Sequence, residues 1–283
     1  MIDEMMDESE ANGLLFSARN LGVTRDRIPL LHSIDWTVRR GEHWVILGHN
    51  GSGKTSLLKC LMNYLTPTTG NVLITSREAA RAAGKPWDEW RRQFGFVSAS
   101  VSQSIEGLET GLEVVMSGHF SMINYWVQET PPEVVEAAKA TLERVECSHL
   151  AGRPWMFLSQ GERQRLLIGR ALMARDLQLL VLDEPCAGLD PVAREHFVNF
   201  VQRLVAGEER GPTLILVTHH VEEIVPAVTH ALVLKHGTQH ACGPKAETIT
   251  SEGLSSAFDA DLEVSENAGR YQLKIHATGE SVM

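Results

Sequence analysis

The sequence predicts an α/β fold: a mainly parallel sheet, an N-terminal antiparallel β subdomain and a helical insertion. Short apolar runs typical of buried strands lie at 43–47, 179–183 and 213–218, and they alternate with segments of helical spacing. Strands joined through helices run parallel, so their carboxyl ends meet at one edge of the sheet, where ligand sites lie. The hydrophobic content of 43% suits a globular protein with a sizeable core.

The first part of the chain is expected to hold the antiparallel strands and the first buried strand. Asp26-Arg27 reads as a turn between two strands, and the leucines of 54–65 recur with helical spacing. In order, the expected elements are short strands within 14–38, a strand at 43–47, a helix at 54–65, a turn at 66–70, and strands at 72–75 and 94–98.

Residues 99–157 are expected to form the helical insertion. Its clearest element is an amphipathic helix over 133–145, which Pro131-Pro132 opens. Beyond it we expect a helix at 162–175, strands at 179–183, 213–218 and 231–234, a turn at 236–237, and a small hairpin of 262–264 and 271–275 across 267–269. We therefore divide the chain into a disordered acidic tail (1–13), a main domain (14–250) and a small C-terminal extension (251–283).

The composition narrows the partners and the compartment. A net charge of −10 argues against non-specific binding to nucleic acid, which rests on Lys and Arg, although a local basic patch stays compatible with it. The four cysteines lie far apart and are interpreted as reduced thiols of a cytoplasmic protein. The acidic N-terminus does not resemble a signal peptide, and no apolar run approaches the ~20 residues of a membrane helix. A role at a membrane would therefore act from its inner face through a partner.

A glycine-rich loop follows the strand at 43–47. Gly48-His49-Asn50-Gly51-Ser52-Gly53-Lys54-Thr55 fits the P-loop pattern, in which glycines let backbone N–H groups surround a phosphate and the next helix adds its positive end. Lys54 is the candidate cation for the β- and γ-phosphates, and Thr55 the candidate hydroxyl for magnesium. A plain glycine-rich turn is the alternative, which the position between a strand and a helix disfavours. We expect residues 48–56, Ser56 included, to bind a nucleotide in a P-loop NTPase core.

The strand at 179–183 ends in two acids. Asp183 is expected to hold magnesium, mainly through water, and Glu184 is placed to polarise the water that attacks the γ-phosphate. Two acids at the end of a strand could also simply face solvent. Their position after a P-loop favours the catalytic interpretation.

The stretch Leu158-Ser159-Gln160-Gly161-Glu162 has two compatible interpretations. Ser159 and Glu162 form the Ser-x-x-Glu pattern of a capping box at a helix start. The stretch also resembles the signature of the ABC ATPases, whose commonest form is Leu-Ser-Gly-Gly-Gln. Gln160 and Glu162 depart from that form, whereas Ser159 and Gly161 are kept.

The resemblance to ABC ATPases covers roughly residues 14–245 and has implications for the site. In that family the signature of one subunit closes over ATP held by another, so Ser159 and Gly161 are implied nucleotide contacts and the chain is implied to pair as an ATP-sandwich homodimer. Gly188-Leu189-Asp190 stands at the place of the D-loop, which passes between the subunits. His219 resembles the switch histidine that contacts the γ-phosphate, and its neighbour His220 stays an alternative.

These matches imply ATP and Mg²⁺ as ligands and an ATPase as the activity. The implied catalytic residues are Lys54, Glu184 and His219, and the implied magnesium ligands are Thr55 and Asp183. The motifs also resemble those of a group of ABC ATPases that is classified with molybdate-transport and photorepair proteins. The matching stretches are Leu-Ser-Gln-Gly-Glu-Arg-Gln-Arg, Cys-Ala-Gly-Leu-Asp and Thr-His-His.

Two features of the family are missing. The glutamine that usually follows a strand such as 94–98, touching magnesium and sensing the coupled partner, is Ala99 here, with Gln103 four residues on. No aromatic residue lies within 21–27 to stack on adenine. In that region Val23 could offer an apolar face and Arg25 its guanidinium plane.

Three functions compete at this point. The favoured one is an ATP-hydrolysing subunit that powers a separate membrane permease; Ala99 weakens it. The alternative is an ABC ATPase that remodels nucleic acid or a ribosome, which the acidic balance weakens. A phosphotransferase is disfavoured because the signature and Glu184 point to hydrolysis and no arginine-rich lid is found.

Overall fold

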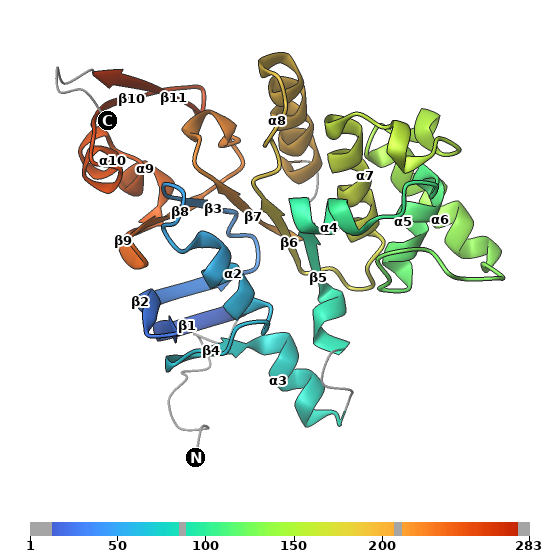
Figure 1. Cartoon of the computed structure of the whole chain (residues 1–283), viewed down its shortest axis with the longest axis horizontal. Coiled ribbons are helices and arrows are strands. Elements are labelled where there is room, and N and C mark those ends of the chain that lie inside the picture. Colours follow the sequence, from blue (N-terminus) through green and yellow to red (C-terminus); the bar gives the residue numbers. More distant parts are fainter. Residues whose placement is uncertain (1–12, 85–88, 207–210, 277–283) are drawn as a thin grey trace.

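The computed structural model describes residues 13–84, 89–206 and 211–276, and it contains a nine-stranded sheet and a separate two-stranded hairpin (Figure 1). The expected tail at 1–13 lies almost wholly outside the described residues. The strands are β1 (Leu14–Arg25), β2 (Ile28–Arg39), β3 (Trp44–Leu47), β4 (Thr69–Ile74), β5 (Phe94–Val97), β6 (Leu179–Asp183), β7 (Thr213–Thr218), β8 (His230–Lys235), β9 (Thr238–Pro244), β10 (Asp261–Asn267) and β11 (Arg270–His276). The α-helices are α2 (Lys54–Leu61), α3 (Thr75–Ala82), α4 (Ala99–Ser104), α5 (Gly111–His119), α6 (Pro132–Arg144), α7 (Gln160–Leu172), α8 (Pro191–Ala206), α9 (Lys245–Thr248) and α10 (Ser251–Phe258). Short 3₁₀ helices lie at η1 (Glu89–Gln93), η2 (Ser148–Leu150), η3 (Trp155–Phe157) and η4 (Val221–Glu223).

The sheet is parallel in its centre and antiparallel at its N-terminal side. Its strand order is β4-β1-β2-β9-β8-β3-β7-β6-β5, with β5, β6, β7, β3 and β8 paired in parallel. β1 pairs antiparallel with both β2 and β4, and β8 with β9. This confirms the predicted α/β class with an antiparallel N-terminal part.

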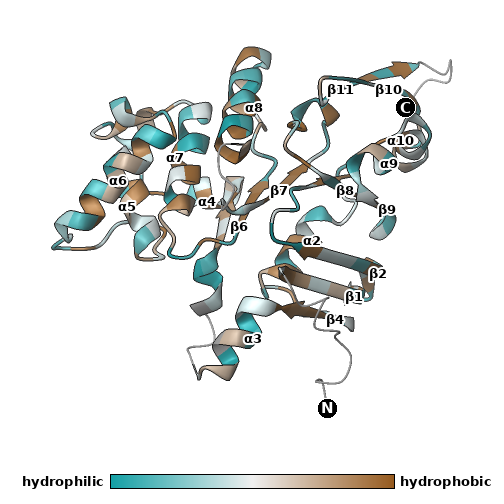
Figure 2. Cartoon of the chain, turned by 180° about the vertical axis from the view of Figure 1, so that it is seen from behind, coloured by the Kyte–Doolittle hydropathy of each residue, from teal (hydrophilic) through white to brown (hydrophobic). Residues whose placement is uncertain are grey.

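The central strands are buried on both faces, and their side chains divide between two cores. In β3, Val45 and Leu47 join the core under the helices, whereas Trp44 and Ile46 join the core under α2 and the N-terminal strands. The same alternation continues through β6, β7 and β8, because successive side chains of a strand point to opposite faces. Each fully buried Leu, Ile or Val contributes about 1.5–3 kcal/mol, so these unbroken apolar strands anchor the fold. Figure 2 shows the apolar colouring concentrated on these strands and on the inner sides of the helices.

The N-terminal strands are longer than expected. β1 and β2 have 12 residues each and form one hairpin whose turn is Asp26-Arg27, both with positive φ (50° and 65°). Two successive residues of left-handed φ make a type I′ turn, which suits the right-handed twist of a hairpin. The predicted turn is therefore confirmed.

Several predicted boundaries were wrong by a few residues. The helix expected to reach 65 ends at Leu61, and Asn63 just beyond it has a left-handed φ of 56°. Residues 69 and 70 belong to β4 rather than to the preceding turn, since Thr69 pairs with Gly22. A Cβ at Gly70 (φ 68°) would lie 2.1 Å from Asn20 O, so only glycine allows this close pairing. Helix α3 was not predicted, and the helix expected at 162–175 spans Gln160–Leu172.

The helical insertion is confirmed in kind: α4, α5 and α6 lie within 99–157 and pack with α7 on one side of the sheet (Figure 1). The C-terminal hairpin is also confirmed, with Asn267 paired to Arg270 across the turn. Figure 1 shows α9, α10 and the hairpin gathered at the opposite end from α5 and α6. The division of the chain at residue 250 stays a prediction. Within the part of the chain that the structure describes, no helix has the length and apolarity to cross a membrane.

Candidate functional site

Three neighbouring strands bring the predicted motifs to one edge of the sheet. Leu47 of β3 pairs with Thr218 of β7, and Asp183 of β6 pairs with Val217 of β7. The residues that follow these strand ends are the P-loop, Glu184 and His219. Motifs that lie more than a hundred residues apart in the sequence are therefore adjacent, as the parallel arrangement predicts.

The P-loop folds back so that its first residue, Gly48, packs closely against Ser52 and the end of β8. A Cβ at Gly48 would lie 2.4 Å from Leu234 O and 2.5 Å from Ser52 Oγ, so no larger residue fits there. Gly237 N donates to Ser52 O (3.0 Å), which fixes the loop against the β8–β9 turn. Ser52 is fully buried, and among the described residues its Oγ has no hydrogen-bond partner. Helix α2 then begins at Lys54.

Lys54 is held inside this loop. Its Nζ donates to Gly48 O (2.7 Å) and to His49 O (3.1 Å), and its side chain is only 5% exposed. Nζ also lies 3.6 Å from Glu184 Oε1. Burial lowers the pKa of the Lys54 ammonium, and the negative charges of Glu184 and Asp183 partly oppose that shift.

The two acids after β6 differ in their surroundings. Burial raises the pKa of the Asp183 carboxyl, the charge of Glu184 adds to the rise, and Lys54 and Lys59 oppose it. Glu184 adopts a left-handed φ of 47°, and its N–H donates to Val217 O (2.9 Å). This conformation costs a non-glycine residue about 1–2 kcal/mol. The hydrogen bond to the neighbouring strand holds it, and the side chain is directed to Lys54 and His219.

His219 rather than His220 faces the acids. His219 Nδ1 lies 3.4 Å from Glu184 Oε1, although no hydrogen bond of good geometry links the two atoms. His220 is exposed, and its backbone N–H donates to Thr218 Oγ1 (3.0 Å). Thr218 Oγ1 in turn donates to Glu223 Oε2 (2.6 Å), which closes the loop after β7. The structure thus brings together Lys54, Glu184 and His219, the three predicted catalytic residues.

Lys54 and Glu184 line a cleft of ≈ 910 Å³, whereas His219 lies beside Glu184 and is not among the lining residues. Its floor includes Lys54, Thr55, Ser56, Asp183 and Glu184. The set of a hydroxyl and a carboxylate, Thr55 and Asp183, fits Mg²⁺, which takes oxygen ligands and usually only one or two protein carboxylates beside substrate phosphates. No group of three or more His, Cys, Asp or Glu in the described ranges could hold a metal by itself.

The far end of the cleft contains residues that sequence reasoning missed. Ile28 and Pro29, which follow the hairpin turn, line it together with His236. Ile28 is 62% exposed, which is unusual for its type, and this exposure appears only in the folded structure, so the sequence offered no signal for it. Val23, suggested as the apolar face for adenine, is 1% exposed and lies in the core, so that suggestion was wrong. Arg25 does not belong to the lining of the cleft.

The start of α4 also lines the cleft, and it includes Ala99, where the resemblance led us to expect a glutamine. Ser98 caps α4, Ser98 Oγ lies 2.8 Å from Ser100 Oγ, and both line the cleft with Ala99. Gln103 is exposed on α4 and is not among the lining residues. Two serine hydroxyls therefore line the cleft on either side of Ala99 in the sequence.

The signature residues lie away from this cleft. Ser159 and Gly161 are not among its lining residues. Ser159 N and Oγ both donate to Glu162 Oε2 (2.7 and 2.8 Å), and Glu162 N donates back to Ser159 Oγ (3.4 Å). The predicted capping box is therefore confirmed. A single chain does not bring the signature to its own P-loop.

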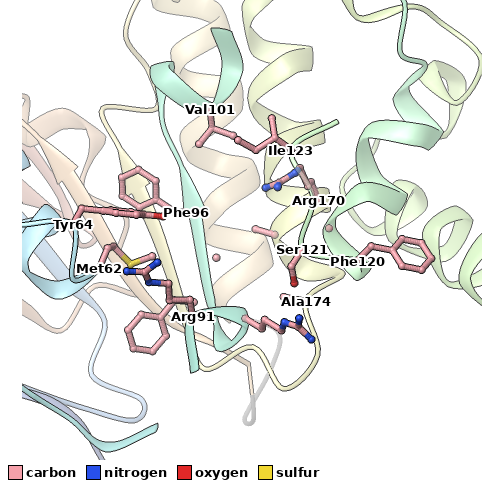
Figure 3. A pocket seen from close by; sticks show the side chains of 15 residues that line it. Met62, Tyr64, Arg91, Phe96, Val101, Phe120, Ser121, Ile123, Arg170 and Ala174 are labelled. Atoms are coloured by element: carbon pink, nitrogen blue, oxygen red, sulfur yellow. The ribbon is translucent and has the colours of Figure 1, made fainter. Parts of the chain in front are cut away.

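A second hollow, of ≈ 440 Å³, lies between the sheet edge and the helical insertion. Figure 3 shows Phe96 and Phe120 on opposite sides of it, with Val101 and Ile123 next to each other between them. Arg170 of α7 is held on the side of the helical insertion, since its Nε donates to Ser117 Oγ (3.1 Å) and a terminal nitrogen donates to Met122 O. The lining of the hollow mixes apolar side chains with three arginines, Arg91, Arg92 and Arg170.

Comparison with known proteins identifies relatives over nearly the whole chain. The ABC transporter family matches residues 31–187. The uncharacterized ABC transporter ATP-binding protein YlmA of Bacillus subtilis (strain 168) is 38% identical over 258 residues, which cover 91% of this chain and 96% of YlmA. The ABC transporter ATP-binding protein ModF of Escherichia coli (strain K12) is 32% identical over 206 residues, covering 72% of this chain and 41% of ModF.

The fold has close counterparts among solved structures. An inward-facing structure of a putative metal-chelate type ABC transporter matches with a TM-score of 0.72 and 22% identity, covering 93% of this chain and 97% of that one. At this identity the likeness shows the fold alone.

Proposed function

This chain belongs to the ABC transporter family, and from that membership we propose that two copies hydrolyse ATP at shared sites and so drive a separate membrane permease. ATP binding and ATPase activity are general properties of the family. The observation that carries the proposal is the meeting of Lys54, Glu184 and His219 at the ends of adjacent strands, with Nζ and Nδ1 at 3.6 and 3.4 Å from one carboxylate oxygen.

Each of these residues has a distinct part in hydrolysis. Glu184 orients the attacking water and takes its proton as the new bond to the γ-phosphorus forms, and ADP leaves with the electrons of the broken bond. The buried ammonium of Lys54 stabilises the negative charge on the phosphate oxygens. His219 contacts the γ-phosphate and keeps the carboxylate of Glu184 directed to the water.

Thr55 and Asp183 hold Mg²⁺, which supplies positive charge to the phosphate oxygens when it is bound. The loop 48–56, which includes Ser52, binds the phosphates. Ile28 and Pro29 provide the apolar surface on which the adenine rests, in place of the missing aromatic residue.

Two copies complete the site because one chain leaves the signature away from its own cleft. Ser159 and Gly161 stand at the start of α7, and a Cβ built at Gly161 meets only Leu189, at 3.8 Å. This open helix N-terminus suits the γ-phosphate held by a second copy. Glu162 accepts the Ser159 hydroxyl hydrogen in the free chain, so closure requires that hydroxyl to exchange partners.

The permease is proposed to bind in the hollow beside Ile123. Its apolar side chains, among them Phe96 and Ile123, and the positive charges of Arg170 and exposed Arg92 complement a short amphipathic segment with an acidic side chain. The hollow adjoins Val101 of α4, the helix that Ser98 and Ala99 begin at the cleft. Movement of α4 therefore links the nucleotide to the permease, at the cytoplasmic face of the membrane.

The concentration dependence of ATP hydrolysis tests the shared site. With Mg²⁺ present, phosphate release per chain is expected to rise with protein concentration until the chains pair. A chain that releases phosphate at the same specific rate across a hundredfold dilution would contradict the pairing. A chain that releases none would contradict the hydrolase proposal.

Affinity purification from detergent-solubilised membranes of the native host tests the permease. A multi-span membrane protein is expected in stoichiometric amount with the wild type and with Ile275→Glu, an exposed control position remote from the hollow. It should be lost with Ile123→Glu, which places a charge in the apolar wall. Recovery of ribosomes or nucleic acid instead would favour the alternative function.

A further inference from the structure

The C-terminal hairpin touches the segment that carries His219. β11 packs on η4, the 3₁₀ turn that begins two residues after His219. Tyr271 and Leu262 of the hairpin are 3% and 4% exposed and belong to the same core as Ile224. The extension is thus packed into the main domain rather than appended to it.

Arg270 makes the most specific of these contacts. Its Nη1 and Nη2 donate to Glu195 Oε1 (3.0 Å) and Oε2 (2.9 Å), a forked pair with one carboxylate. Nη2 also donates to Glu222 O (3.0 Å), and Leu273 N approaches Glu222 Oε1 (3.4 Å). Hydrogen bonds from Arg270 lower the pKa of the Glu195 carboxyl, which keeps the pair charged. One guanidinium therefore joins α8 to η4, and just beyond η4 Ala227 N donates to Gln202 Oε1 of α8 (2.9 Å).

Both elements lead directly to the ATP site. Glu222 lies three residues after His219, in the loop that closes through Thr218 and Glu223. Glu195 lies in the first turns of α8, whose N-terminus is capped by Asp190, since Asp190 Oδ1 accepts from Val192 N and Ala193 N (2.9 Å each). The loop 184–190 connects that cap to Glu184. The position of α8 relative to η4 therefore affects the distance and orientation between the side chains of Glu184 and His219.

We propose that Arg270 is a positioning residue for ATP hydrolysis, which fixes the His219 loop against helix α8 so that His219 and Glu184 face each other. The inference rests on the proposed function and deepens it, because it gives the C-terminal extension a part in turnover. Arg270 is remote from the P-loop, so it acts on the chemical step and leaves ATP binding alone. The planar guanidinium of arginine suits this task better than the ammonium of lysine, since it can donate hydrogen bonds to a carboxylate and to a backbone carbonyl at the same time.

Steady-state ATPase kinetics of Arg270→Ala test the inference. We expect kcat to fall about five- to tenfold, because small misplacements of catalytic groups are costly, while KM and the ATP dissociation constant stay within about twofold. Arg270→Lys should recover part of kcat, since an ammonium keeps one of the contacts. The matched control is Lys274→Ala, which breaks the Lys274–Glu263 pair (3.2 Å) inside the same hairpin and should leave kcat unchanged.

The outcomes separate this inference from the proposed function. A wild-type chain without ATPase activity contradicts the function itself. An active wild type with Arg270→Ala at wild-type kcat, or with kcat and ATP affinity falling together, overturns the positioning role. If Arg270→Ala does not fold, Glu195→Gln tests the same inference, because it weakens the paired hydrogen bonds between Arg270 and α8. This variant is expected to lower kcat without changing ATP affinity. Where both variants fold, the double variant should be no worse than the worse single one, since both remove one interaction.

Discussion

Replacing Glu184 with glutamine is expected to stop ATP hydrolysis and to trap two chains around bound ATP. Glutamine has the same shape and keeps the left-handed backbone at this position. It removes the charge that lies 3.6 Å from Lys54 Nζ and 3.4 Å from His219 Nδ1. It also removes the group proposed to orient the water and take its proton.

The structure sets different magnitudes for stability and for turnover. The Glu184 side chain is 34% exposed, and partly exposed ion pairs contribute about 0–1 kcal/mol each, so the free energy of unfolding should change by roughly 1 kcal/mol or less. Loss of a general base costs about 10²- to 10⁴-fold in rate. At 1.36 kcal/mol per tenfold, the barrier should rise by about 3–5 kcal/mol. The variant is therefore expected to fold normally and to turn over slowly.

Phosphate release and size-exclusion chromatography, each with MgATP, measure the two effects. Glu184→Gln should elute as a dimer with ATP and as a monomer without it. Glu146→Gln, an acid on the helical insertion paired with Arg165 and Arg203, serves as the charge-matched control and should behave as the wild type. Turnover within tenfold of the wild type, or a variant that stays monomeric with ATP, would refute the role given to Glu184.

Four further outcomes follow from the same geometry. Lys54→Ala should weaken ATP binding roughly 10- to 100-fold, the value of a charge-assisted hydrogen bond, and an unchanged fluorescence titration would contradict the P-loop assignment. Ser159→Arg should abolish hydrolysis while one chain still binds ATP; normal turnover would argue against a signature shared across the dimer. Ile28→Asp should weaken ATP binding several-fold but leave inhibition by inorganic triphosphate unchanged, and equal losses for both would remove Ile28 from the adenine surface. Burial raises the pKa of every thiol, to about 11 for Cys60, Cys147 and Cys242, so thiolate is scarce at pH 8 and alkylation should be slow until denaturant is added. Rapid labelling of the three buried thiols, Cys60, Cys147 and Cys186, in the native chain would contradict their burial.

Local sequence patterns predicted correctly those features that depend on a single turn, helix end or strand. The capping box at Ser159, the turn at Asp26-Arg27 and the buried strand at 179–183 were all predicted, because each depends on residues within a few positions of one another. Val23 was misjudged for the opposite reason. Its side chain alternates into the core of the β1–β2 hairpin, and that direction depends on which strands pack beneath it.

The sequence by itself determined the motifs, the strand ends that carry them and the chemistry that their side chains can perform. The tertiary structure alone decided which of those side chains meet: His219 with Glu184, Ile28 with the cleft, and Arg270 with both α8 and the loop after β7. The physical reason is that phosphate loops, caps and periodicities are encoded over a few residues, whereas contacts between distant segments depend on strand order and on packing of the two cores. Such contacts form only when the whole sheet is assembled.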